Sequence, residues 1–271
     1  MSKKAFCVGI NDYPYDGSDL NGCINDAHAW AELMVEHYGF AQADVKLVTD
    51  AQAKKADILA GLKDLLTGAK SGDLLVFTNS SHGTYVADTS GDEPSYDEAL
   101  CPYDCAENLL IDDELRELFA NIGKGVELVV ISDSCFSGTV TRAAVAEAIP
   151  GLRTPDDRRV RFLNPALRGD KVLENPWKAM PKSKQKYPES KMKELLVSGC
   201  TDKEYSYDAL IDGVYHGAMT YYALEAIRTA NYKLTFQQLV TRVNHLLDQG
   251  GYPQHPQLEG RSVNKKRPIF T

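Results

Sequence analysis

The chain has 271 residues, of which 43% are hydrophobic and 25% charged, and its formal net charge is −8. These proportions are those of an ordinary soluble globular protein, and the length suits one large α/β domain. The negative charge argues against a general nucleic-acid binder, and no apolar stretch is long enough to span a membrane. The N-terminus leads directly into a strand pattern without a signal-peptide core, so we expect a cytoplasmic protein that binds neither nucleic acid nor membrane.

Six cysteines are scattered along the chain, and four of them lie in or beside apolar, strand-like runs. In a cytoplasmic protein we expect such cysteines to be reduced and buried rather than paired. Cys101 and Cys105 have no second pair of ligands at metal-binding spacing. The cysteines therefore do not predict a zinc site.

Strand and helix patterns alternate along the chain, which predicts a mainly parallel sheet covered by helices on both faces. From pattern alone, Asn25 or Asp26 is the N-cap of the first helix, and Gly39 ends that helix. Thr235 and Gln238 form a capping-box pattern at the start of the last helix. We expect strands at residues 5–10, 45–50, 73–78, 127–131, 193–201 and 267–270, and helices at 26–38, 54–69, 112–122, around 219–227 and from 235 to 247.

Three segments lack these patterns. After the third strand, the sequence up to residue 104 predicts a polar loop, and loops this long are usually functional or mobile. Residues 142–193 predict a long, exposed connection, because 151–193 hold 12 Lys or Arg against 5 Asp or Glu and five prolines. This basic linker is either a solvated connection or a segment that is cut or occupies an acidic cleft. It would divide a single domain into a large part, 1–141, and a small part, 194–271. Residues 250–260 predict turns.

Two predicted strands end in residues that suit nucleophilic catalysis. One runs into Asp133 and Cys135, and the other runs into His82 and Gly83. Ligands bind beyond the carboxyl ends of parallel strands, and a histidine can take the proton of a thiol. The backbone N–H groups of Gly83 and Cys135 would then stabilise a tetrahedral oxyanion. From these residues alone, a buried cysteine near a structural histidine remains an alternative.

The segments Ser80-Ser-His82-Gly83-Thr84 and Asp133-Ser-Cys135-Phe-Ser-Gly138 resemble the histidine and cysteine motifs of caspase-like (clan CD) peptidases. Within that clan the chain is most similar to the metacaspases and their prokaryotic relatives, the orthocaspases. His82 lies 53 residues before Cys135, and caspases place their histidine about 50 residues upstream of the cysteine. Further similar segments follow in the family's order at residues 20–27, 97–104, 111–115, 198–201 and 217–221. The resemblance covers nearly the whole chain and is weakest across the basic linker.

The resemblance implies a caspase-hemoglobinase-like fold, a three-layer α/β/α sandwich around a mainly parallel central sheet. It also implies a cysteine endopeptidase of peptidase family C14 that acts as a monomer on basic peptides or proteins. In such an enzyme, His82 and Cys135 form the dyad and Gly83 contributes to the oxyanion site. Family members are often processed between their two parts, so we expect self-cleavage in the basic linker.

The resemblance further implies cleavage after Arg or Lys. Asp26 and Asp133 match the acids of the family's S1 pocket, and Cys23 and Ser80 match its walls. Two carboxylates in a partly dry pocket select a guanidinium or ammonium group, whereas a substrate Asp would meet like charge. The pocket role of Asp26 competes with its interpretation as a helix cap.

The chemistry itself requires no cofactor, but many metacaspases are activated by calcium. The matching carboxylates here are Asp97, Asp112 and Asp113, although acids at 112 and 113 also suit a helix N-terminus. Two positions depart from the family pattern. Arg142 stands where the family has a fourth carboxylate, which weakens the calcium prediction, and Ser81 stands where glycine is common, beside the oxyanion region.

Three rival interpretations stay open or are disfavoured. A caspase-like pseudo-protease that serves as a signalling or interaction module would be expected to have a defective dyad, but both members are present. A caspase-like enzyme with another P1 preference is the second rival. A nucleotide-binding α/β protein is disfavoured because no glycine-rich phosphate loop follows the first strand.

Overall fold

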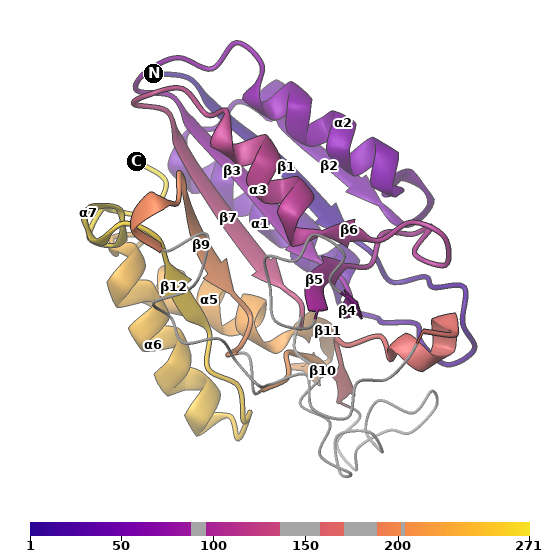
Figure 1. The fold of residues 1–271 in the computed structure, drawn as a ribbon. Helices are drawn as coiled ribbons and strands as arrows, with labels where there is room; N and C mark the ends of the chain where they lie inside the picture. Colours follow the sequence, from indigo (N-terminus) through magenta and orange to yellow (C-terminus); the bar gives the residue numbers. More distant parts are fainter. Residues whose placement is uncertain (88–95, 136–157, 171–188, 202–203) are drawn as a thin grey trace.

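Five parallel strands form the centre of the molecule, and a sixth, antiparallel strand closes one edge (Figure 1). The computed structural model describes residues 1–87, 96–135, 158–170, 189–201 and 204–271. The strand order is β12-β9-β7-β3-β1-β2, so β3 and β7 are neighbours at the middle of the sheet. The strands are β1 (Lys3–Gly9), β2 (Val45–Thr49), β3 (Leu74–Ser80), β7 (Glu127–Asp133), β9 (Glu194–Ser198) and β12 (Gln257–Glu259).

Helices cover both faces of this sheet, because alternate residues of each strand point to opposite faces. In β1, Ala5 and Cys7 belong to one buried apolar cluster, and Phe6 and Val8 belong to the other. The first cluster includes α1 (Cys23–Tyr38), α5 (Ala218–Thr229) and α6 (Phe236–Gln249), and the second includes α2 (Lys55–Leu66) and α3 (Asp112–Ala120). The predicted three-layer α/β/α architecture around a mainly parallel sheet is confirmed (Figure 1).

The helix boundaries follow local signals. Gly39 ends α1 in the left-handed conformation with φ of 71°, and Thr235 and Gln238 form the predicted capping box of α6. The N-cap prediction at the start of α1 was wrong, because the helix already begins at Cys23 and Asp26 lies inside its first turn. Among the described residues, no helix has the length and hydropathy needed to cross a membrane. Within the described ranges, the remaining short helices are η1 (Gln42–Asp44), η2 (Asp50–Gln52), η3 (Pro165–Arg168), η5 (Glu189–Lys191) and α7 (Ser262–Lys265).

Two small antiparallel sheets lie beyond the carboxyl ends of the central strands (Figure 1). They are β4 (Gly83–Ala87), β5 (Tyr96–Leu100) and β6 (Leu110–Ile111), and β8 (Arg159–Val160), β10 (Tyr207–Ile211) and β11 (Val214–Gly217). The sequence predicts a polar loop from the end of β3 to residue 104. That prediction was wrong for residues 83–87 and 96–100, because these form β4 and β5, which pair with each other. The last strand was also misplaced, since β12 lies among the predicted turns of 250–260. Residues 267–270 contribute only a single bridge, from Pro268 to Thr235.

Residues 158–170 and 189–193 of the basic linker are described, and within them 160–163 are not the exposed connection that the sequence predicts. The linker strand β8 pairs with β10, and Arg161, Phe162 and Leu163 are 0%, 6% and 1% exposed. Residues 142–157 and 171–188 of the linker, including Arg142, lie outside the described residues. Residues 160–163 therefore cross the end of the central sheet as a buried segment.

Candidate active site

The histidine and cysteine motifs meet because their strands are neighbours. β3 and β7 pair in parallel, with Ser80 opposite Asp133. His82 and Cys135 each lie two residues beyond this last pair, at the same edge of the sheet. Both side chains are buried, at 4% and 0% exposure. Packing of the sheet thus places the two predicted catalytic residues side by side in the fold.

A carbonyl group occupies the position between these two motifs. The backbone oxygen of Arg161 accepts hydrogen bonds from the N–H of Gly83 at 3.0 Å and from the N–H of Cys135 at 3.2 Å. Paired backbone donors of this kind stabilise a developing oxyanion. Ser81, where the family commonly has glycine, turns away from the carbonyl, because its hydroxyl donates to the His82 carbonyl at 3.0 Å. The Ser81 side chain therefore leaves the N–H groups of Gly83 and Cys135 available to bind the carbonyl oxygen.

His82 is held as a neutral imidazole. Its Nε2 lies 2.7 Å from the carbonyl oxygen of Ser18, a contact that requires the proton on Nε2, and its backbone N–H donates to the hydroxyl of Tyr13 at 2.8 Å. Nδ1 then carries the lone pair, and it has no hydrogen-bond partner within the described ranges. Burial lowers the pKa of His82 from 6.5 to about 4, partly offset by the Ser18 contact, and the cation of Arg161 lowers it further. A contact with the Arg161 backbone raises this pKa, so the imidazole ring lies beside that residue.

The lowered pKa of His82 predicts an acid-dependent loss of stability. Between pH 6.5 and 4 the unfolded chain binds a proton at His82 that the folded chain does not, so this contribution is complete above pH 6.5 and falls as the pH drops. A shift from 6.5 to about 4 corresponds to about 3 kcal/mol. Lowering the pH from 7 to 4 should therefore destabilise the wild type by about 3 kcal/mol more than His82→Gln. Denaturant unfolding of both proteins at the two pH values measures this difference. Parallel stability curves for the two proteins would contradict the assignment of a buried neutral histidine.

The thiol of Cys135 lies against Ser206, in the segment that precedes β10. Its Sγ contacts both the N–H and the carbonyl oxygen of Ser206, the latter at 3.5 Å, and it also contacts the thiol of Cys200. The same carbonyl of Ser206 accepts the N–H of Arg161 at 2.8 Å. The sulfur and Arg161 therefore share a backbone partner, although no hydrogen bond joins Cys135 to His82 in the described part of the chain.

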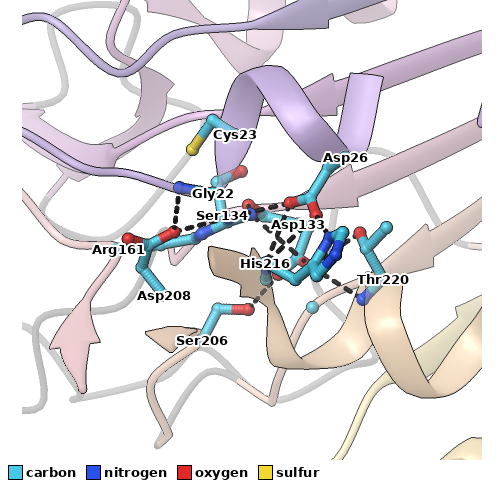
Figure 2. A network of polar contacts seen from close by, with 12 residues as sticks. Gly22, Cys23, Asp26, Asp133, Ser134, Arg161, Ser206, Asp208, His216 and Thr220 are labelled. Atoms are coloured by element: carbon cyan, nitrogen blue, oxygen red, sulfur yellow. Dashed lines mark hydrogen bonds and ion pairs between the residues drawn. The ribbon is translucent and has the colours of Figure 1, made fainter. Parts of the chain in front are cut away.

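The side chain of Arg161 enters a pocket of carboxylates. Its Nη2 lies 2.7 Å from Asp26 and 3.0 Å from Asp208, and its Nη1 lies 3.4 Å from the carboxylate of Asp133 and 3.0 Å from that residue's carbonyl oxygen (Figure 2). None of the four side chains is more than 1% exposed. In so dry an environment, charge-assisted hydrogen bonds to a guanidinium are strong and selective.

Each carboxylate of the pocket is fixed by groups from the small part of the chain or from the start of α1. Asp133 accepts from the hydroxyl of Ser206 at 2.5 Å and from Thr220, and Asp26 accepts from the N–H of Gly217 at 3.0 and 3.1 Å. His216 and the N–H groups of Asn21 and Gly22 complete the set, the first at Asp26 and the others at Asp208. Gly217 is required here, because a Cβ would lie 2.1 Å from Asp133 and 2.5 Å from Arg161. Burial raises the pKa of Asp26, and the charge of Arg161 opposes that rise.

The two predicted wall residues lie at the same edge. Cys23 is fully buried, and the nearby charge of Arg161 opposes the rise that burial imposes on its thiol pKa. Ser80 ends β3 directly beside Asp133, and its carbonyl oxygen accepts the N–H of Ile10. Figure 2 shows Cys23 and Asp26 at the start of α1 with Asp133, Arg161 and Asp208.

This arrangement agrees with comparisons to known families. The family model of the metacaspase, peptidase C14 domain matches residues 3–144, which is just over half of the chain. The chain belongs to the metacaspase family. Metacaspase-1 of Cryptococcus neoformans is 33% identical over 94% of this chain and 62% of its own length. Metacaspase-9 of Arabidopsis thaliana is 29% identical over 94% of this chain and 93% of its own length, whereas the match to Arabidopsis metacaspase-8 spans only 38% of that protein.

Solved structures show the same fold. Protein GSU0716 from Geobacter sulfurreducens aligns over 100% of this chain and 99% of its own, with a TM-score of 0.74 and 27% identity. Caspase-1 from Spodoptera frugiperda aligns over 95% of this chain and 86% of its own, with a TM-score of 0.55 and 12% identity. The second match supports the caspase-like fold alone.

The carboxylates expected to bind calcium lie apart from the dyad, in β5 and at the start of α3. Arg116 forms ion pairs with Asp112 and with Asp113, the latter at 2.6 Å, while Asp97 is buried in β5. In the described part of the chain, no group of three or more His, Cys, Asp or Glu side chains is placed to hold a metal ion. No step of the chemistry below uses a calcium ion. Calcium activation stays a prediction.

Sequence reasoning missed three residues of this site. Asp208 supplies a third carboxylate, Arg161 supplies the bound cation, and Tyr13 positions the backbone of His82. Tyr13 follows β1, so its place at the carboxyl edge of the sheet was available from the strand pattern. Arg161 and Asp208 carry no local signal, because their positions depend on the pairing of β8 with β10.

Proposed function

We propose that this chain is a cysteine endopeptidase that hydrolyses peptide bonds after Arg or Lys, and that its own residues 158–163 lie in the active site as a bound substrate. One observation carries the proposal. Arg161 places its carbonyl oxygen between the N–H groups of Gly83 and Cys135 and its guanidinium among three buried carboxylates. The P1 residue of a substrate must make both contacts at once, with its carbonyl oxygen on the oxyanion donors and its side chain in the carboxylate pocket.

The backbone around Arg161 is held in an extended form, as a protease holds its substrate. On the N-terminal side, β8 pairs antiparallel with β10, with Val160 opposite Tyr207. On the C-terminal side, the N–H of Leu163 donates to the carbonyl of Gly83 at 2.9 Å. The Phe162 ring stacks on Tyr85 with a centroid distance of 6.0 Å. These contacts support the Arg161–Phe162 bond as the scissile bond.

The chemistry follows from the named groups. His82 takes the thiol proton on Nδ1, because its Nε2–H is engaged with Ser18, and the Cys135 sulfur attacks the Arg161 carbonyl carbon. The Gly83 and Cys135 N–H groups stabilise the resulting oxyanion. The imidazolium then gives its proton to the amine of Phe162, the C–N bond breaks, and an acyl-enzyme forms. Water, deprotonated by His82, hydrolyses the thioester and restores the thiol.

The pocket accounts for the preference. Three carboxylates face one cation, so the pocket without a bound cation holds uncompensated negative charge. A P1 Arg or Lys neutralises part of this charge, whereas an Asp would add to it. The planar guanidinium reaches all three carboxylates together, which favours Arg over Lys.

Fluorogenic peptides with Arg, Lys, citrulline or Asp at P1, assayed with calcium and with a chelator, test this proposal. We expect hydrolysis of the Arg and Lys peptides and none of the Asp peptide, and the chelator measures any calcium activation separately. Citrulline retains the shape of arginine without its charge, so it isolates the electrostatic part of the selectivity. A protein that binds these peptides and cleaves none would instead be the pseudo-protease.

A further inference from the structure

Arg158, three residues before Arg161, occupies a second binding site for a guanidinium group. Its Cζ lies 4.0 Å from the ring centroid of Tyr252, and its Nη1 donates to the carbonyl oxygen of Gly251 at 2.7 Å. A cation at this distance over an aromatic face is attracted to the ring's π electrons. The site thus offers a guanidinium two different attractive contacts, one to its face and one to its edge.

The aromatic ring that contacts Arg158 is packed into the body of the protein. Tyr252 is 7% exposed, belongs to the apolar cluster beneath α5 and α6, and contacts Tyr222 edge-on with a centroid distance of 5.8 Å. The turn that presents the Gly251 carbonyl requires glycine, because Gly251 has φ of 71°, and a Cβ at Gly250 would lie 2.1 Å from the hydroxyl oxygen of Tyr222. The N–H of Tyr252 is bound to Leu247 at the end of α6.

The electrostatic surroundings also suit a cation. Burial raises the pKa of Tyr222, the ring that supports Tyr252, and the charges of Glu225 and Asp212 raise it further, whereas the charge of Arg158 lowers it. Two carboxylates therefore act on the same aromatic group as the bound guanidinium. By contrast, the neighbouring Arg159 places its guanidinium on the backbone carbonyl of Asp19.

We propose that Tyr252 and the carbonyl of Gly251 form an S4 subsite that takes a guanidinium, so that preferred substrates carry Arg at P4 in addition to the basic residue at P1. This inference rests on the proposed function, because it treats residues 158–161 as the P4 to P1 positions of a substrate. The chain's own sequence at these positions, Arg-Arg-Val-Arg, is then the model of a good substrate.

Matched coumarin peptides test the subsite. Arg-Arg-Val-Arg should be hydrolysed with a kcat/KM about tenfold higher than Ala-Arg-Val-Arg, as expected for a cation over an aromatic ring with one charge-assisted hydrogen bond. Citrulline at P4 should behave like alanine, and alanine at P3 should have a smaller effect than alanine at P4. In Tyr252→Leu the ratio between the Arg and Ala peptides should fall toward one, and in Tyr252→Phe it should be retained because the ring remains.

A blocked single-residue arginine substrate, which does not reach Tyr252, separates the two proposals. Its hydrolysis combined with equal kcat/KM values for Arg and Ala at P4 would overturn the S4 subsite and leave the proposed function intact. Failure to hydrolyse this substrate and all the tetrapeptides would overturn the proposed function and the subsite with it. An unchanged ratio in Tyr252→Leu would also overturn the subsite.

Discussion

Replacing Cys135 with alanine should reduce hydrolysis of Arg peptides by at least about a thousandfold, because it removes the thiol of the residue whose backbone N–H binds the Arg161 carbonyl. The oxyanion donors and the pocket remain, since both use the backbone or other side chains, so the variant's own Arg161 should stay bound there. Steady-state kinetics on the fluorogenic peptides measure the loss.

Cys7→Ala is the matched control for this variant. Cys7 is also a fully buried thiol, but it lies within β1, whereas Cys135 lies beyond the end of β7. The Cys7→Ala variant should retain a kcat/KM close to that of the wild type. Hydrolysis by Cys135→Ala at a rate similar to that of the wild type would show that another group attacks the carbonyl.

Asp26→Asn should lower kcat/KM for Arg peptides by about 10²–10³, because truncating one partner of a buried, hydrogen-bonded charge pair costs about 2–5 kcal/mol. The direct 2.7 Å ion pair between Asp26 and the guanidinium is the contact that is weakened. Hydrolysis of the citrulline peptide should change far less, since its side chain has no charge to lose contact with. The selectivity for Arg over citrulline is therefore the decisive quantity.

Asp57→Asn is the control for net charge, because Asp57 is exposed on α2, outside the pocket. Asp57→Asn should leave kcat/KM for the Arg and citrulline peptides unchanged. If Asp26→Asn slowed the Arg and citrulline peptides equally, Asp26 would be a structural residue. The Asp208→Asn variant should behave as Asp26→Asn does, which tests the carboxylate that sequence reasoning missed.

Local patterns were sufficient to predict the elements that carry the dyad. The runs before His82 and Cys135 are buried strands of parallel type, and the position of each residue just past its strand end follows from chain geometry alone. Because the carboxyl ends of neighbouring parallel strands meet at one edge, the pattern also predicted their proximity. The helix end at Gly39 and the capping box at Thr235 were predictable for the same local reason.

The parts that escaped prediction depend on contacts between distant segments. β8 has only two residues, in a segment rich in proline and lysine, and it is a strand only because β10 pairs with it. Arg161 is one of 12 basic residues in 151–193, and nothing in its local sequence indicates that it meets three carboxylates. Asp208 likewise lies in β10, a strand that the sequence patterns did not predict. Tertiary contact, rather than local sequence, assigns both residues to the pocket.

The position of self-cleavage tests most directly whether residues 158–163 are bound as a substrate. The full-length chain and its Cys135→Ala variant would be incubated, and the fragments analysed by intact mass and N-terminal sequencing. We predict that the active protein yields a fragment that begins at Phe162, that Arg161→Lys yields the same fragment, and that Arg161→Gln and Cys135→Ala do not. An enzyme that hydrolyses added Arg peptides while its Arg161–Phe162 bond stays intact, or that cleaves itself only elsewhere, would contradict the account.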